Sequence, residues 1–433
     1  ALYSRHERHV QAAVASARAK ARVPRFSISR QTRAFRRAFF PDADDRDWSD
    51  WHWQLQHSLR GLAALERVLQ LSDEERAGLQ RNRNSLPNSI TPYYASLLNR
   101  SDASDPLRRT MVMASQEFER TPEESIDPLH EDDDSPVPGL VHRYPDRVLF
   151  LTTGTCPVYC RYCTRSRVVG SHDGTYEFST NQWQGAIDYI ARTPVIRDVL
   201  LSGGDPLILS DDRLEWLLSR LRKIKHVEFL RIGSKVPVVL PQRVTPALVK
   251  MLKKYHPLWM SIHFIHPSEL TKEVEQSCGR LADAGIPLGS QTPLLKGIND
   301  DVEVCRQLFH GLLRFRVKPY YLYQADLVVG TSHFRTAVNK GLEIISQLRG
   351  HTTGYAVPTF AIDVPGGGGK IAVLPDSNLP REDGDVMLPN YEGRVFRFPD
   401  PPRYPCPMKI GFTYDLRADY LREGYTEEET AEF

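Results

Sequence analysis

The segment VLFLTTGTCPVYCRYCTRSR (residues 148–167) decides the fold. It opens with a short run of β-branched and apolar residues, which is typical of a buried strand, and passes directly into a loop with three cysteines. These are Cys156, Cys160 and Cys163, in a CxxxCxxC spacing. Six cysteines in 433 residues do not form the dense framework of a secreted disulfide protein. Half of them in one loop therefore indicates a ligand site.

The strand pattern of this segment repeats further along the chain. Each later apolar run is separated from the next by a stretch with helical periodicity, and successive βα units predict a parallel sheet with right-handed crossovers. We therefore predict the α/β class, with a partial (β/α)6 barrel of the TIM type. The six predicted strands are 148–153, 199–204, 228–234, 259–264, 287–292 and 320–326.

The remaining sequence divides around this barrel. We predict a helical N-terminal region with a linker (1–140), the barrel (141–350), and a glycine-rich segment with a C-terminal appendage (351–433). In the first region Ser72 and Glu75 have the spacing of a helix capping box. The segment EDDDSPVPG (131–139) breaks regular structure, as either a linker or a lid over the barrel.

Composition and charge limit the possible partners. Hydrophobic residues make up 41% of the chain, and no apolar run is long enough to span a bilayer. The net charge is 56 − 54 = +2, so we expect neither nucleic acid nor membrane binding. Residues 1–40 carry ten Lys and Arg against Glu7 alone, as a basic arm or as a helix docked on an acidic neighbour, which we favour. No secretory leader pattern is found, and we expect a cytoplasmic protein.

Unusual residues fall where the predicted strands end. In parallel α/β sheets the chemistry collects at the carboxyl ends of the strands, so these residues predict a single site built from six loops. Besides the cysteine loop they are Gly203, Gly204, Asp205, Ser234, Lys235, His263, Gln291 and Asp326.

The cysteine loop suits an iron–sulfur cluster. Three thiolates on one short loop can bind three irons of a [4Fe–4S] cluster and leave the fourth iron open for a small molecule. The alternatives are a zinc site or cysteines buried as small apolar residues. Structural zinc sites use four ligands, usually supplied by pairs of CxxC motifs, whereas this loop supplies only three cysteines.

A second motif is the glycine run Pro365-Gly-Gly-Gly-Gly-Lys370. A phosphate-binding P-loop would need Gly at position 364 and Ser or Thr at 371, where this chain has Val364 and Ile371. Glycines leave room around Lys370 for a bulky planar group bonded to its amine. Pyridoxal phosphate (PLP) held as a Schiff base is the candidate, and a surface loop with an incidental lysine is the alternative.

Together, the cysteine loop, the glycine turn at Gly203 and Gly204, and the barrel resemble the radical S-adenosylmethionine (SAM) superfamily. Over residues 45–400 the chain resembles the lysine 2,3-aminomutase family in HEDDDSPVPGLVHRYPDRVLFL (130–151), RIGSKVPVVLPQR (231–243), GIPLGSQTPLLKGIND (285–300) and DVPGGGGK (363–370). This resemblance implies an isomerase that uses a [4Fe–4S] cluster, SAM and PLP. It would move the α-amino group of a cationic amino acid from C2 to C3, converting L-lysine to L-β-lysine.

The resemblance also implies roles for individual residues. The cysteines would bind the cluster, Lys370 would carry PLP, and Arg165 would bind the substrate carboxylate. Asp326 and Asp363 would receive the distal cation, since two converging carboxylates select a positive group. The positions implied for PLP are Arg143, Tyr144, Ser234 and Lys235, and those implied for SAM are Gly203, Gly204, Asp205, His263 and Gln291.

Some expectations stay open at this point. Arginine is an alternative substrate, because a guanidinium also pairs with two carboxylates. A non-catalytic Fe–S redox or binding protein is the alternative of another class. The zinc site of the clostridial enzymes would need a cysteine where this chain has Asp301, and the tail has only Cys406, so we predict no zinc. As partners we expect the amino acid substrate, an electron donor such as flavodoxin or ferredoxin, and a second copy in a dimer or tetramer.

Overall fold

The structure is a computed structural model that describes residues 26–81, 86–170, 177–375, 381–382, 385–390 and 392–398. The chain divides into two compact units, Ala1–Pro375 and Asp376–Phe433. The second unit contains a small antiparallel sheet of β12 (Arg381–Glu382), β13 (Asp385–Pro389) and β14 (Val395–Phe398). In the described part of the chain, no helix is long and apolar enough to cross a membrane. The predicted domain boundaries stay predictions.

The N-terminal region is helical, as the sequence predicts. Residues 51–71 do not form a single helix. They are interrupted by strand β1 (Leu59–Arg60), which pairs with β2 (Ser89–Ile90). Gly61 follows β1 with a φ of +70°, which only glycine adopts readily. The helices are α2 (Arg30–Phe39), α3 (Asp45–Ser49), α4 (Trp51–Gln56), α5 (Gly61–Glu66), α6 (Asp73–Arg81), α7 (Pro92–Ala95) and α8 (Pro106–Arg109).

The described part of the basic N-terminal segment is the docked helix α2. The side chain of Arg36 is buried and its Nη1 lies 2.7 Å from Asp45. Just before the helix, the Ser29 amide donates to Glu273 at 2.7 Å. These contacts agree with a helix docked on acidic neighbours for residues 26–40, whereas residues 1–25 lie outside the described residues.

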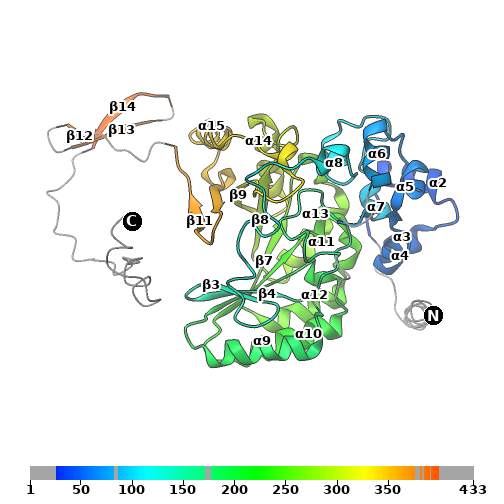
Figure 1. The fold of residues 1–433 in the computed structure, drawn as a ribbon, viewed down its shortest axis with the longest axis horizontal. Helices are drawn as coiled ribbons and strands as arrows, with labels where there is room; N and C mark the ends of the chain where they lie inside the picture. Colours follow the sequence, from blue (N-terminus) through cyan, green and yellow to red (C-terminus); the bar gives the residue numbers. More distant parts are fainter. Residues whose placement is uncertain are drawn as a thin grey trace. The chain divides into compact units, whose positions relative to one another are not determined.

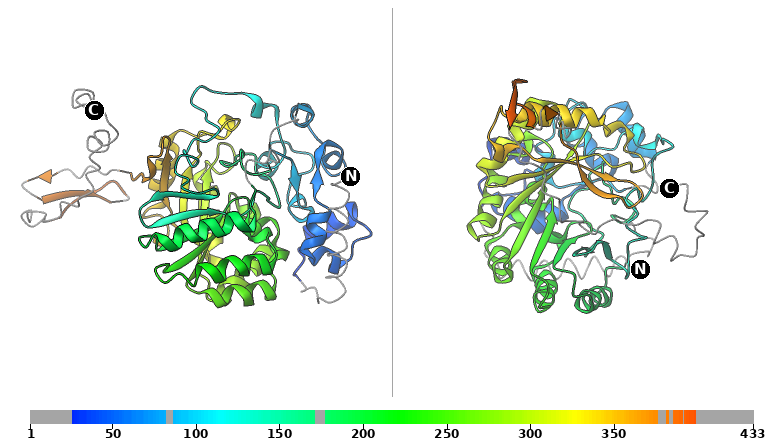
Figure 2. Two further views of the ribbon diagram at one scale, coloured as in Figure 1. Left: turned by 60° about the horizontal axis from the view of Figure 1, so that its bottom comes forward. Right: turned by 90° about the vertical axis from the view of Figure 1, so that its left-hand side faces the viewer.

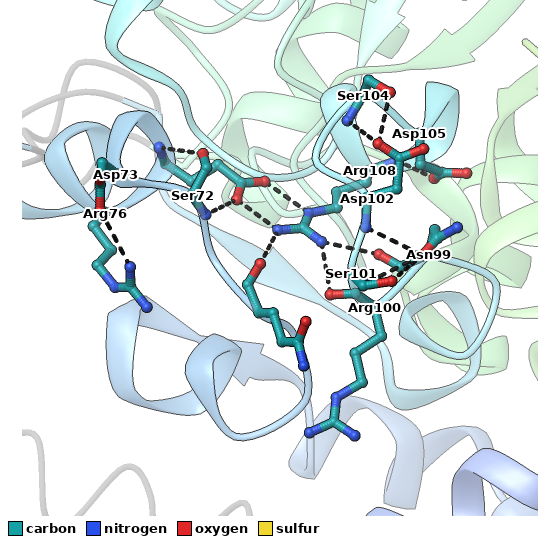
Figure 3. Close-up of polar contacts among 12 residues, drawn as sticks. Ser72, Asp73, Arg76, Asn99, Arg100, Ser101, Asp102, Ser104, Asp105 and Arg108 are labelled. Carbon is teal, nitrogen blue, oxygen red and sulfur yellow. Dashed lines mark hydrogen bonds and ion pairs between the residues drawn. The ribbon is translucent and has the colours of Figure 1, made fainter.

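The predicted capping box is present at the start of α6. The Ser72 amide donates to the Glu75 carboxylate at 2.7 Å, and the Glu75 amide donates to the Ser72 hydroxyl at 3.2 Å. The same carboxylate accepts two bonds from Arg108, at 2.8 and 2.6 Å. Figure 3 shows the Arg108 guanidinium surrounded by acceptors, which include the carbonyls of Asn99 and Arg100 at 3.0 and 2.9 Å. A fully buried charge is thereby both paired and hydrogen-bonded.

The barrel is one curved sheet of nine strands in the order β11-β10-β9-β8-β7-β6-β5-β4-β3 (Figure 1). All six predicted strands are present and parallel, so the predicted barrel is confirmed. They are β4 (Arg147–Leu151), β5 (Asp198–Ser202), β6 (Phe229–Ser234), β7 (Leu258–His263), β8 (Leu288–Leu294) and β9 (Lys318–Gln324).

Three further strands extend this sheet. β3 (Leu140–Tyr144) pairs antiparallel with β4 at one edge. At the other edge β10 (Thr359–Val364) runs parallel to β9, and β11 (Gly369–Ala372) returns antiparallel to β10. The sequence places β10 and β11 in the C-terminal segment, but they belong to the sheet of the barrel.

Helices cover the outer face of this sheet (Figure 2). Each presents an apolar face to the strands; in α10, for example, Leu214, Leu217, Leu218 and Leu221 are fully buried. The helices leave the inner face of the sheet and the carboxyl ends of the strands uncovered, and these surround the cavity described below. The helices are α9 (Thr180–Arg192), α10 (Asp211–Leu221), α11 (Val236–Val239), α12 (Pro246–Leu252), α13 (Lys272–Asp283), α14 (Val302–Arg314) and α15 (Val338–Leu348).

Candidate active site

One cavity of about 520 Å³ lies inside the barrel at the carboxyl ends of its strands. All the residues predicted for the site line it, although they come from segments more than 200 residues apart. They are Arg143, Tyr144, Cys156, Cys160, Cys163, Arg165, Gly203, Gly204, Asp205, Ser234, Lys235, His263, Gln291, Asp326, Asp363 and Lys370. The structure therefore brings every predicted residue to one place.

The three cysteines lie on the loop after β4 and are free thiols. Burial raises the pKa of Cys163 to about 11 and that of Cys156 well above its ordinary value. A bound metal would hold them as thiolates, so the loop fits a metal cluster. Among the described residues, no three His, Cys, Asp or Glu side chains gather closely enough to hold a single metal ion.

The glycine turn after β5 packs directly on the start of the cysteine loop. Gly203 has a φ of +125°, and a side chain at Gly204 would lie 2.7 Å from the carbonyl carbon of Thr155. The Asp205 amide donates to the Thr155 carbonyl at 2.9 Å. Both glycines are therefore required by sterics, and the turn fixes the backbone that leads into Cys156.

The side chain of Asp205 is used within the protein. Its carboxylate accepts bonds from the Ser234 hydroxyl and the Lys235 amide, both at 2.7 Å, and from the Val236 amide at 2.9 Å. Burial raises the pKa of Asp205 to about 6 although these bonds favour its charged form. Asp205 thus ties the end of β5 to the end of β6, which leaves the backbone of the turn to face a ligand.

Ser234 and Lys235 have their contacts with the glycine-turn side of the cavity. Lys235 Nζ donates to the buried Glu269 carboxylate at 2.8 Å and to the His263 carbonyl at 3.3 Å. Glu269 also accepts from Tyr94 at 2.8 Å. The family resemblance assigns Ser234 and Lys235 to PLP, but their neighbours are residues that it assigns to SAM.

His263 and Gln291 lie side by side on neighbouring strands, because they are paired in the register of β7 and β8. His263 Nε2 lies 3.0 Å from the Tyr162 hydroxyl, and the two rings are stacked. Burial and the charge of Lys235 lower the pKa of His263 well below its ordinary value, so the imidazole is neutral. It can therefore exchange hydrogen bonds with a ligand without carrying a charge.

The glycine-run lysine belongs to the hairpin of β10 and β11. Their register pairs Asp363 with Lys370, and the Lys370 Nζ forms an ion pair with the Asp363 carboxylate. The Lys370 amide donates to the Tyr144 hydroxyl at 2.8 Å. The second carboxylate oxygen of Asp363 is buried without a hydrogen-bond partner. An unpartnered oxygen beside this amine fits a site that receives a further cation.

Basic residues gather next to this lysine on the hairpin of β3 and β4. Arg143 pairs with Asp134 at 2.7 Å and also donates to the Leu129 carbonyl. Sequence reasoning missed Arg147, whose guanidinium lies 3.9 Å from the centre of the Tyr144 ring and which lines the cavity. Its signal was the HRYPDR motif, where two arginines flank one turn. Arginine pairs suit a phosphate group.

Arg165 and Asp326 are each fixed by a neighbour. Arg165 donates to Glu131 at 2.6 to 3.1 Å, and Asp326 accepts from Thr164 at 2.5 Å. Burial and the charge of Asp363 raise the pKa of Asp326 to about 6. Burial opposes ionisation of Glu131, but the charges of the neighbouring arginines lower its pKa. Glu131 lines the cavity, so the segment 131–139 contributes a residue to the wall of the site.

Comparison with known proteins agrees with this geometry. A family model described as Lysine-2,3-aminomutase matches residues 345–431, and one of the Radical SAM superfamily matches residues 150–308. The L-lysine 2,3-aminomutase of Fusobacterium nucleatum is 51% identical over 89% of this chain and 92% of that protein. The chain belongs to the lysine 2,3-aminomutase family. The L-lysine 2,3-aminomutase of Clostridium subterminale is 50% identical over 84% of this chain and 87% of that protein.

Membership of the lysine 2,3-aminomutase family confirms several predictions. The radical SAM fold, the isomerase class and the three cofactors, namely a [4Fe–4S] cluster, SAM and PLP, are those the sequence predicts. Glutamate 2,3-aminomutase of Clostridioides difficile, at 42% identity over 83% of this chain and 84% of that protein, is a more distant relative. The roles of single residues are not decided by these comparisons.

Proposed function

We propose that this protein is a lysine 2,3-aminomutase that converts L-lysine to L-β-lysine. The observation that carries the proposal is the pair Asp326 and Asp363, which line the same cavity as Arg165. An arginine suits the α-carboxylate, and two carboxylates that line one cavity suit a distal ammonium. A glutamate side chain would bring a third negative charge against the two aspartates, which disfavours an acidic substrate.

The residues of the cavity fit the three cofactors. We assign Cys156, Cys160 and Cys163 to the cluster and Lys370 to the covalent attachment of PLP. The PLP phosphate would lie against Arg143, Tyr144 and Arg147, since its charge needs basic partners. SAM would meet the backbone of Gly203, Gly204 and Asp205 and the side chains of His263 and Gln291. Because Ser234 and Lys235 contact Asp205 and Glu269, we assign them to the SAM side as well.

The cluster with SAM supplies a radical that removes a hydrogen from the substrate, and PLP holds the migrating nitrogen. The residues of the protein bind the substrate and orient it. Asp363 holds Lys370 Nζ by an ion pair, and its second carboxylate oxygen, which is buried without a hydrogen-bond partner, would be available to the distal cation of the substrate. Thr164 holds Asp326, and Arg165 fixes the other end of the substrate. The C2–C3 bond is thereby held between two anchors of opposite charge.

Arginine remains a second candidate substrate, since its guanidinium can pair with both aspartates. A non-catalytic Fe–S protein is disfavoured, because the cysteines, Lys370 and both charged ends of the cavity occur together. We also propose that an electron donor such as flavodoxin or ferredoxin reduces the cluster, and that the chain forms a homodimer or homotetramer. We propose a cytoplasmic location, where thiols stay reduced.

The experiment is to supply reconstituted enzyme with lysine, arginine, ornithine or glutamate and to detect β-amino acids by mass spectrometry. We expect β-lysine from lysine. Turnover of glutamate alone would refute the argument from the paired aspartates. Lys370→Ala should lose the visible absorbance of covalently bound PLP together with activity, while it keeps its iron content.

A further inference from the structure

Glu131 forms a side-on pair with Arg165, the arginine assigned to the substrate carboxylate. We propose that Glu131 is a positioning residue, which turns the Arg165 guanidinium so that one defined edge of it faces the amino acid. This inference rests on the proposed function, because it concerns the recognition of the substrate carboxylate.

The hydrogen bonds occupy one edge of the guanidinium. Arg165 Nε donates to the two Glu131 oxygens at 3.1 and 3.0 Å, and Nη2 donates to Oε1 at 2.6 Å. A guanidinium has five N–H groups in a rigid plane, so a carboxylate on the Nε–Nη2 edge fixes the direction of all the others. The orientation of Arg165 is therefore set before any substrate binds.

The edge formed by Nη1 and Nη2 stays available. Glu131 takes one N–H of Nη2 and none of Nη1, and among the described residues Nη1 has no hydrogen-bond partner. Arg165 lines the cavity together with Asp326 and Asp363, and a quarter of its side chain is exposed there. A second carboxylate can bind this edge through two parallel bonds, which is the geometry that an α-amino acid needs.

Glu131 is itself held in place. Its side chain is 5% exposed, and Arg167 Nη2 lies 3.5 Å from its second oxygen. The segment that carries it, residues 127–134, which we call the acidic strap, is anchored at further points. Arg167 pairs with Asp127 at 3.2 Å and Asp132 at 3.1 Å, and Arg143 pairs with Asp134 at 2.7 Å. A braced carboxylate suits a permanent support better than a group that leaves.

The opposite interpretation is that Glu131 competes with the substrate carboxylate for Arg165. In that case Glu131 would occupy Arg165 in place of the substrate carboxylate and would have to withdraw before binding. The two interpretations predict opposite signs, because removal of a support weakens substrate binding and removal of a competitor strengthens it. The side-on edge and the bracing by Arg167 favour the support.

The experiment compares lysine with lysinamide, which keeps both amines and lacks the carboxylate. Binding to the reconstituted enzyme is measured by calorimetry without reductant, so that no turnover occurs. The variants are Glu131→Gln, which keeps the shape without the charge, Glu131→Asp, which keeps the charge, and Asp132→Asn as a matched control in the same strap. Asp132 is 57% exposed and pairs with Arg167 rather than Arg165.

We expect Glu131→Gln to weaken lysine binding about tenfold, or about 1.4 kcal/mol, and to change lysinamide binding little. Glu131→Asp should fall between Glu131→Gln and the unchanged enzyme, and Asp132→Asn should keep the preference for lysine. Unchanged or tighter lysine binding in Glu131→Gln would overturn the proposal, and so would an equal loss for both ligands, which marks a structural role. Failure of the unchanged enzyme to bind lysine would instead refute the proposed function.

Discussion

Asp326 is a half-buried carboxylate that must be charged in order to receive a cation. Its pKa is raised to about 6 by burial and by the nearby charge of Asp363. The protonated form therefore predominates below that pH, where Asp326 no longer attracts the distal ammonium of lysine. Above it, the ionised pair is available.

We expect the KM for lysine to rise as the pH falls through about 6. The measurement is the pH profile of KM and kcat for lysine between mildly acidic and mildly alkaline buffers. Asp326→Asn should bind lysine weakly at every pH and show no such rise. A KM that stays constant across this range in the unchanged enzyme would contradict the role assigned to Asp326.

At the scale of elements, the glycine turn supports the cysteine loop by backbone contact. A methyl group at Gly204 would lie within 2.8 Å of the Thr155 backbone, which no small side-chain movement can relieve. We expect Gly204→Ala to displace the loop that leads into Cys156 and so to reduce the iron bound per chain. Iron and sulfide assays after reconstitution measure this. Gly185→Ala, at a helical glycine with open space around it, is the control and should bind iron normally.

At the start of α6, the Glu75 carboxylate makes two separate stabilising interactions. Glu75 closes the capping box with Ser72 and also pairs with the fully buried Arg108. We expect Glu75→Gln to lower the free energy of unfolding by about 3–5 kcal/mol, because it leaves a buried guanidinium without its counter-charge. Ser72→Ala removes only a cap and should cost about 1 kcal/mol. Equal losses in denaturant titrations of the two variants would contradict the importance of the pair.

The sequence predicted the elements whose pattern is local. The six barrel strands could be identified because each apolar run is followed by a helical one, and the capping box because its two residues lie three apart. The hairpin of β10 and β11 could not be assigned to the barrel, since pairing of β10 with β9 is a tertiary contact and Gly369–Ala372 is a short strand. The sequence did not reveal strand β1 within the helical region after α4, because β1 pairs with β2, about 30 residues away.

At the scale of the whole molecule, the sequence placed the site residues at strand ends, and the curved sheet brings them together. What it could not show is which side chains pair across the cavity. The contacts of Glu131 with Arg165 and of Lys235 with Glu269 join residues 34 apart in the chain, with no periodicity to reveal them. Glu131 had one signal, an acidic segment just before an arginine-rich loop.

The metal content of the whole chain is a further prediction. Asp301 caps α14 through bonds to the Glu303 and Val304 amides at 2.8 and 3.0 Å, which is a structural use of the position where the clostridial enzymes would need a cysteine. Cys406 lies outside the described residues. We expect metal analysis of the reconstituted protein to find iron and no stoichiometric zinc. One zinc per chain would contradict this prediction.

The β10–β11 hairpin has a consequence for how the enzyme can change. Asp363 and Lys370 face each other across one register, so the hairpin holds the proposed cofactor attachment and the acid next to it as one unit. A single-residue insertion in either strand would turn its side chains to the opposite face and separate the two functions. Substitution at Asp363 could therefore alter the choice of substrate, whereas a change in the length of either strand would disrupt the site. Exchange of the whole hairpin between relatives would transfer the lysine and the aspartate together.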